Sequence, residues 1–136
     1  MSQYKCEYFK IYELVDPLTY KQYGQSAWQF LDPRLLITID KLRAVFGPAT
    51  INNWKWGGKF KWSGLRTPEC RIGAKMSQHR FGRAADMKFK NISAKEIRKA
   101  IKSDPMWTKY IHCVENKVNW LHIDVRNCDP IKWINP

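Results

Sequence analysis

Two short segments with strictly alternating residues constrain the fold of this 136-residue chain more than any other feature. They are residues 84–89 and residues 120–126, and in each of them every second residue is apolar. The apolar positions are Ala85, Met87 and Phe89 in the first segment and Leu121, Ile123 and Val125 in the second. Because successive side chains of a β-strand point to opposite faces, we predict two strands, over residues 82–89 and 119–125, that each bury one face of a sheet.

The other face of these two strands carries ionisable residues of the types that bind metal ions. Asp86 lies on it in the first strand, and His122 lies on it in the second. Laid side by side, the strands bring Asp86 and His122 together, and His79 arrives from the loop that precedes the first strand. Two imidazoles and one carboxylate leave one tetrahedral position of a zinc ion open, as in catalytic zinc sites. The competing interpretation is three unrelated polar residues at the surface.

Two helices are predicted from their capping residues. Asp32 and Pro33 suit the cap and the first position of a helix over residues 33–46, whose apolar residues recur at intervals of three and four. Gly47 and Pro48 end this helix. Ser93, followed three residues later by a glutamate, forms a capping box that opens a second helix reaching about residue 102.

The remaining segments are predicted to add strands and loops. Residues 4–15 favour an edge strand, residues 49–62 a strand and a turn, and residues 63–77 an irregular loop. Residues 110–114 favour a further strand, joined by a tight turn to the strand over residues 119–125. No repeat or linker interrupts the chain, so residues 1–136 are expected to form one domain. This order of elements predicts an α+β fold, an antiparallel sheet with helices packed on one face.

The chain is strongly basic, with 24 basic and 12 acidic residues and a net charge of +12. Such a charge attracts polyanions, including the anionic polymers of a bacterial envelope. The basic residues are spread along the chain, so no sequence-specific nucleic-acid module is predicted. The chain shows no signal peptide at its N-terminus and no apolar run long enough for a transmembrane segment.

Four cysteines, at positions 6, 70, 113 and 128, form no Cys-x-x-Cys pair. Free thiols in a reducing compartment are the expected state. A rival interpretation is a structural zinc held by Cys70, Cys113 and Cys128 together with a histidine such as His112. The spacings match no zinc finger or ribbon, which favours free thiols.

Three sequence motifs resemble those of the hedgehog/D-Ala-D-Ala peptidase superfamily of zinc peptidases. The run SQHRFGRAAD, residues 77–86, resembles the family signature with its serine, histidine, glycine, alanine and aspartate. The run WLHIDVR, residues 120–126, resembles the later histidine strand, above all in short phage and prophage members. The run SGLR, residues 63–66, resembles the segment whose arginine binds a substrate carboxylate. The matches follow the family's order over residues 63–126.

The resemblance implies a hedgehog/DD-peptidase-like fold with zinc (Zn2+) held by His79, Asp86 and His122. It implies that Arg66 anchors an anionic end of the peptide, a role that suits a guanidinium group. The implied activity is hydrolysis of peptidoglycan stem or cross-link peptides, as a DD-carboxypeptidase or endopeptidase that resembles a phage endolysin. Such an enzyme is expected to be monomeric. It would wait in the host cytoplasm until release to the cell wall, or travel with the virion.

The sequence departs from the family at the general base. Many relatives have a glutamate or aspartate three residues before the last zinc histidine, where this chain has Asn119. Two carboxylates on the same strand faces can replace it, Glu115 and Asp124, of which Glu115 is favoured because Asp124 also suits a role in orienting a ligand. Asn119 keeps open an alternative, a non-catalytic zinc-binding virion or cell-wall-binding module with the same fold. A basic nucleic-acid binder is a third function class, which only the charge and the aromatic residues support.

Overall fold

The structure is a computed structural model that describes residues 3–136. Its α-helices are α1 (Pro17–Tyr23), α2 (Pro33–Phe46) and α3 (Ala94–Ser103), and its strands are β1 (Ala49–Thr50), β2 (Ala84–Phe89), β3 (Cys113–Glu115), β4 (Leu121–Asp124) and β5 (Lys132–Ile134). Short 3-10 helices connect them: η1 (Ile11–Glu13), η2 (Gly24–Phe30), η3 (Trp54–Trp56), η4 (Gln78–Phe81) and η5 (Pro105–Lys109).

The five strands form one sheet in the order β1-β2-β4-β3-β5. The first four are antiparallel to their neighbours, and the β2–β4 register pairs Asp86 directly with His122. β5 runs parallel to β3. The chain reverses direction after β4. Because β2 and β3 already pair with both edges of β4, the last strand of the chain, β5, pairs with β3 instead. The α+β prediction is confirmed, with a mixed sheet in place of a purely antiparallel one.

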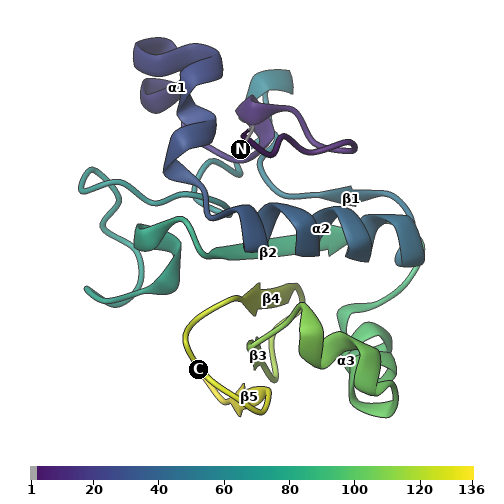
Figure 1. Cartoon of the computed structure of the whole chain (residues 1–136). Helices are drawn as coiled ribbons and strands as arrows, with labels where there is room; N and C mark the ends of the chain where they lie inside the picture. Colours follow the sequence, from purple (N-terminus) through teal and green to yellow (C-terminus); the bar gives the residue numbers. More distant parts are fainter. Residues whose placement is uncertain (1–2) are drawn as a thin grey trace.

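Helices α2 and α3 pack on the apolar face of the sheet (Figure 1). Their buried residues form one cluster with those of the strands, and this cluster includes Leu35, Leu36, Ile39, Leu42, Met87, Ile97, Ile101, Leu121 and Ile123. The predicted helix starts are both observed. The Asp32 carboxylate accepts from the backbone N–H of Arg34 at 2.9 Å, and the Ser93 hydroxyl accepts from that of Glu96 at 3.1 Å. The opposite face of the sheet is therefore available for a site.

The edge strand expected over residues 4–15 was a wrong prediction. This segment forms no strand and contains only η1. The backbone N–H groups of Glu7 and Tyr8 donate to the Asp40 carboxylate of α2, at 2.8 and 3.2 Å, instead of to a neighbouring strand. Apolar residues of the segment such as Phe9 and Ile11 are buried in the core, and the Asp40 carboxylate satisfies backbone N–H groups that a neighbouring strand would otherwise pair.

The strand predicted within residues 49–62 is much shorter than expected. Only Ala49–Thr50 pair with β2, and η3 follows. The Asn53 side chain accepts from the backbone N–H of Phe60 at 2.9 Å, and Gly57 has a positive φ of 85°. An asparagine that bonds to the backbone and a left-handed glycine both favour a turn over an extended strand.

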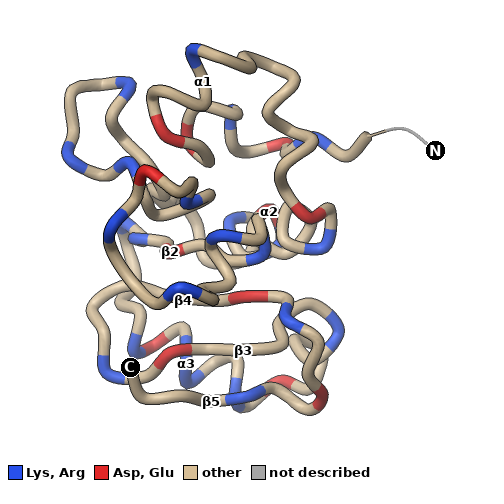
Figure 2. The backbone as a smooth tube through the Cα atoms, turned by 90° about the vertical axis from the view of Figure 1, so that its left-hand side faces the viewer, with Lys and Arg blue, Asp and Glu red and all other residues tan. Residues whose placement is uncertain are grey.

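Basic residues are distributed over many segments of the chain, as the sequence indicated (Figure 2). Within residues 3–136, no helix combines the length and the apolar character needed to cross a bilayer. The four cysteines are free thiols in the structure.

Candidate metal centre

His79, Asp86 and His122 come from one turn and two adjacent strands. His79 lies in η4, which the Ser77 hydroxyl caps by accepting from the His79 N–H at 3.3 Å. Gly82 ends this turn with a φ of 68°, a conformation that suits glycine because a Cβ there would be strained. Asp86 lies in the middle of β2 and His122 in β4. The turn thus places His79 next to Asp86 and His122, which are paired across β2 and β4.

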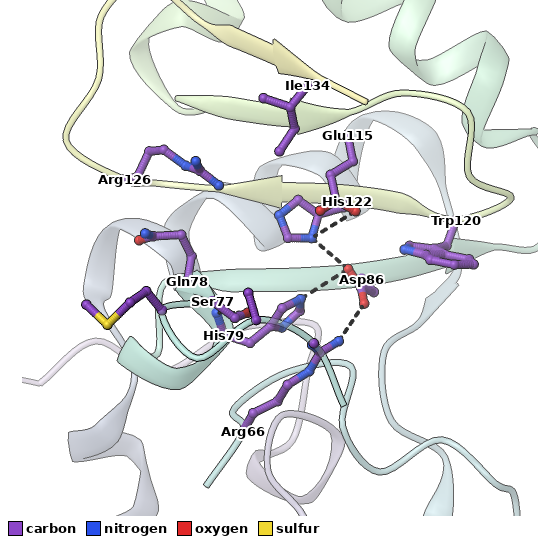
Figure 3. A pocket seen from close by; sticks show the side chains of 13 residues that line it. Arg66, Ser77, Gln78, His79, Asp86, Glu115, Trp120, His122, Arg126 and Ile134 are labelled. Carbon is purple, nitrogen blue, oxygen red and sulfur yellow. Dashed lines mark hydrogen bonds and ion pairs between the residues drawn. The ribbon is translucent and has the colours of Figure 1, made fainter. Parts of the chain in front are cut away.

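The three side chains converge on one point (Figure 3). One ligand atom of each lies within 4.8 Å of the others, and within residues 3–136 this is the only such group of His, Cys, Asp or Glu residues. Asp86 Oδ1 lies 3.3 Å from His79 Nε2 and 2.9 Å from His122 Nδ1. Ligands of a tetrahedral zinc ion stand about 3.3 Å apart. The His–Asp–His group is therefore positioned to bind a metal ion.

The second nitrogen of each imidazole is occupied by the protein. His79 Nδ1 lies 2.9 Å from the carbonyl oxygen of Gly64, to which it donates its hydrogen. His122 Nε2 lies 3.0 Å from Asp124 Oδ2 and donates to this carboxylate. Such contacts fix the tautomer and the orientation of a metal-binding histidine. Nε2 of His79 and Nδ1 of His122 are left facing Asp86.

The proximity of these groups shifts their pKa values in opposite directions. Burial alone would lower the pKa of His122, but hydrogen bonds with Asp124 and Asp86 outweigh it and raise the pKa to about 9. Burial alone would raise the pKa of Asp86, but hydrogen bonds with His122 and His79 hold it well below its usual range. The group therefore presents an ionised Asp86 carboxylate beside the His122 imidazole.

Asp124 is fully buried and belongs to a chain of charges behind His122. Its two carboxylate oxygens accept from Arg126 Nε at 2.8 Å and Arg126 Nη2 at 2.7 Å. Burial would raise the pKa of Asp124, but the hydrogen bonds from Arg126 and His122 keep it below its usual range. Asp124 thus lies on the far side of the His122 ring from Asp86.

Glu115 lies on the other side of this ring. It ends β3, and its Oε1 is 3.9 Å from His122 Nδ1, the nitrogen that faces Asp86. Its side chain is 22% exposed and lines the same cavity as the His–Asp–His group. Asn119, at the position where many relatives have an acid, lines an adjoining cavity that shares Asp86 and Trp120 with the first. Of the two carboxylates considered from sequence, the structure brings Glu115 toward the metal-facing nitrogen.

Arg66 lines the same cavity, which has a volume of about 390 Å³. Its Nη2 lies 3.4 Å from Asp86 Oδ2, and its Nε donates to the carbonyl of Trp62 at 2.9 Å. The Arg66 backbone N–H also donates to the His79 carbonyl at 3.1 Å, which ties the arginine to the histidine turn. The guanidinium group therefore lies beside the metal-binding group. The Trp62 carbonyl accepts from only one of its N–H donors.

The rival cysteine site is not formed by the described residues. Cys70, Cys113 and Cys128 are free and belong to no cluster of ligand atoms. His112 Nδ1 lies 2.7 Å from the backbone carbonyl of Arg126, which satisfies this ring nitrogen. Burial raises the pKa of the Cys113 thiol to about 12, as expected for an inert core cysteine.

Several residues of the cavity received no role from the sequence, among them two that flank β4. Arg126 and Trp120 both line it, and strand alternation had already placed them on the same face as His122. The alternation was the available signal, but it does not distinguish a residue that faces a cavity from one that faces solvent. The Arg126 pairing with Asp124 depends on side-chain conformations that no sequence pattern specifies.

Comparison with known proteins identifies the family. The family model described as Peptidase M15 matches residues 9–124, which is most of the chain. No curated protein and no solved structure matches it. The match extends well beyond residues 63–126, where the motif resemblance was found, and includes the irregular N-terminal region. The chain belongs to the peptidase M15 family, the zinc-dependent metallopeptidases of the hedgehog/D-Ala-D-Ala peptidase superfamily.

Proposed function

We propose that this chain hydrolyses peptidoglycan stem or cross-link peptides, as a DD-carboxypeptidase or endopeptidase. The observation that carries the proposal is one cavity that holds the His–Asp–His group, the Glu115 carboxylate and the Arg66 guanidinium together. This set supplies a metal-binding group, a proton acceptor and an anion-binding group within reach of one peptide bond. The resemblance of residues 63–126 to peptidoglycan peptidases supports the choice of substrate.

His79 Nε2, Asp86 Oδ1 and His122 Nδ1 are the proposed zinc ligands. The donor set fits the ion, since two neutral imidazoles and a carboxylate are common ligands of catalytic zinc. The contacts of His79 with Gly64 and of His122 with Asp124 hold these nitrogens in place. When bound, zinc polarises the scissile carbonyl and makes a neighbouring water more acidic.

Glu115 is the proposed general base. Its carboxylate lies next to the nitrogen of His122 that faces the metal position, where the attacking water must lie. It accepts a proton from this water and delivers a proton to the departing amine. Asp124 is hydrogen-bonded to His122 and Arg126 and orients His122, so it is a positioning residue. Arg66 binds an anionic end of the peptide and fixes the scissile bond over the group.

We further propose a role like that of a phage endolysin or a virion-associated wall enzyme. The net charge of +12 would hold the protein on anionic envelope polymers. The protein would act as a monomer once the wall becomes accessible from the host cytoplasm or from the virion.

The competing function is a non-catalytic zinc-binding wall or virion module. The observation that favours it is Asn119, which cannot accept a proton at the position of the usual base. The position of Glu115 weakens this alternative, because a carboxylate is present beside the metal-binding group from a neighbouring strand.

Metal analysis paired with digestion of purified peptidoglycan tests the two functions. The peptidase proposal expects one zinc per chain and new free amines from the digested wall. His122→Ala should lose zinc and cleavage yet retain salt-sensitive adsorption to envelopes, since adsorption depends on the whole charge. A wild-type chain that binds zinc and adsorbs, but releases no amine from any type of peptidoglycan, would establish the binding module instead.

A further inference from the structure

We propose that Arg126 binds a second anionic group of the substrate, a carboxylate on the residue next to the scissile bond and on the side away from Arg66. The inference rests on the proposed function, because it describes the peptide that the same site cleaves. It assigns the cavity two anion-binding groups, one on each side of the reacting carbonyl. Peptides with a carboxylate on both sides of the cleaved bond are then the preferred substrate class.

Arg126 and Arg66 lie on opposite sides of the His–Asp–His group (Figure 3). Both line the cavity of about 390 Å³ that contains this group. Arg66 approaches from the side of Asp86, with its Nη2 at 3.4 Å from Asp86 Oδ2. Arg126 approaches from behind His122 and has a side chain that is 24% exposed. A peptide that crosses the group therefore passes between two guanidinium groups.

Arg126 has hydrogen-bond donors that the protein does not use. Its Nε and Nη2 form a fork on the two oxygens of Asp124. A guanidinium group carries five N–H donors, so this fork leaves three unused: both of Nη1 and one of Nη2. Within residues 3–136, Nη1 makes no hydrogen bond. The fork also holds the guanidinium plane still, so the unused donors are already oriented and a ligand need not order them.

Hydrogen bonds through Asp124 connect Arg126 to the metal-binding group. Arg126 Nη2 is 2.7 Å from Asp124 Oδ2, which is 3.0 Å from His122 Nε2. Two hydrogen bonds thus separate the guanidinium group from the imidazole ring that faces the metal position. Arg126 also lines the cavity that contains the His–Asp–His group, so we assign the carboxylate that it binds to the residue adjoining the scissile bond.

The other charges of the cavity do not occupy this position. Its acidic residues are Asp86 and Glu115, which face the metal-binding point and have roles there. Asp124 is fully buried and pairs with Arg126 from inside the protein, while the Arg126 side chain is partly exposed and lines the cavity. A planar group with parallel free donors binds a carboxylate by charge-assisted hydrogen bonds.

The test uses two stem-peptide substrates that differ at one residue, on the side of the scissile bond away from Arg66. One carries a free carboxylate there and the other a primary carboxamide, and both keep the C-terminal carboxylate. The zinc-loaded wild type should favour the carboxylate peptide by about 10–100-fold in kcat/KM, the worth of one hydrogen bond to a charged group. Arg126→Gln should reduce this preference to about one.

Two matched variants separate recognition from support of His122. Arg66→Gln should lower kcat/KM for both peptides by the same factor and so keep the preference. Asp124→Asn should lower kcat/KM for both peptides and also reduce the preference, because it weakens the fork that orients Arg126. A wild type without preference would overturn the proposal, as would an Arg126→Gln variant that loses activity on both peptides equally. If the wild type binds zinc but cleaves neither peptide, the proposed function fails. Calorimetric affinities for the two peptides then give the same ratio, and a ratio near one would overturn this inference as well.

Discussion

His79 and His122 reach the same carboxylate of Asp86 from two different kinds of structure. His79 lies in a 3-10 turn, and a backbone carbonyl, that of Gly64, orients its ring. His122 lies in the middle of a sheet, and a side chain, that of Asp124, orients its ring. We call residues 63–66 and 77–82 the loop side of the site, and β3 with β4 the strand side.

The difference shows where the site tolerates substitution. On the loop side, ring orientation depends on backbone geometry, which changes only if the turn itself changes. On the strand side it depends on a buried carboxylate that a single substitution removes. The strand side also carries Glu115 and Arg126, and the loop side carries Arg66. Substitution of the groups that orient the histidine rings should therefore lower metal affinity on the strand side and the free energy of unfolding on the loop side.

The largest effect is expected for Glu115→Gln on the strand side. The variant keeps the shape of the side chain but cannot accept a proton, so kcat should fall by about 10²–10⁴-fold, the usual worth of a positioned acid-base group. Zinc content and thermal stability should stay at wild-type values, as measured by metal analysis and calorimetry. An unchanged kcat would show that another residue is the general base. The two sides of the site would then lack their main chemical difference.

A smaller effect, on folding, is expected for Gly82→Ala on the loop side. Gly82 has a φ of 68°, and an added Cβ would collide with the backbone carbonyl of Phe30. The strain and the collision should lower the free energy of unfolding by more than about 2 kcal/mol. Denaturant unfolding measures the loss. A matched substitution, Gly47→Ala, has a φ of 92° but no atom within 4 Å of the added Cβ, so it isolates the conformational strain from the collision.

Asp124→Asn should weaken metal binding on the strand side by about 10–100-fold, as the loss of a histidine's orienting partner does. Asparagine has one acceptor oxygen where aspartate has two, so it cannot serve His122 and Arg126 together as the carboxylate does. Competition with a chelator of known affinity measures the change. Zinc affinity equal to that of the wild type would show that β4 alone orients His122.

The smallest effect is expected for Ser77→Ala on the loop side. The Ser77 hydroxyl caps η4, and its loss should cost about 1 kcal/mol of stability. Zinc affinity should remain within a few-fold of the wild type, because the Gly64 carbonyl still orients His79. Unfolding and chelator competition are measured on the same preparation. A loss of affinity as large as that of Asp124→Asn would erase the distinction between the two sides.

The accuracy of the sequence predictions also differed between regions. The strands around Asp86 and His122 and the helices after Asp32 and Ser93 were found where the patterns indicated. The N-terminal region was not, because its backbone bonds to distant side chains such as that of Asp40. β5 was missed as well, since it has only three residues and pairs with a strand that precedes it by about twenty positions.

The sequence by itself determined which side chains share a face and where the two long helices begin. Strand alternation and helix caps act between neighbouring residues, so a pattern in the chain is enough to specify them. The tertiary structure decided which nitrogen of each histidine faces Asp86, and that Glu115 lies beside the metal-binding group while Asp124 lies behind it. These outcomes depend on Gly64, Arg126 and the β3–β4 register, contacts between residues far apart in the chain that form only when the sheet closes.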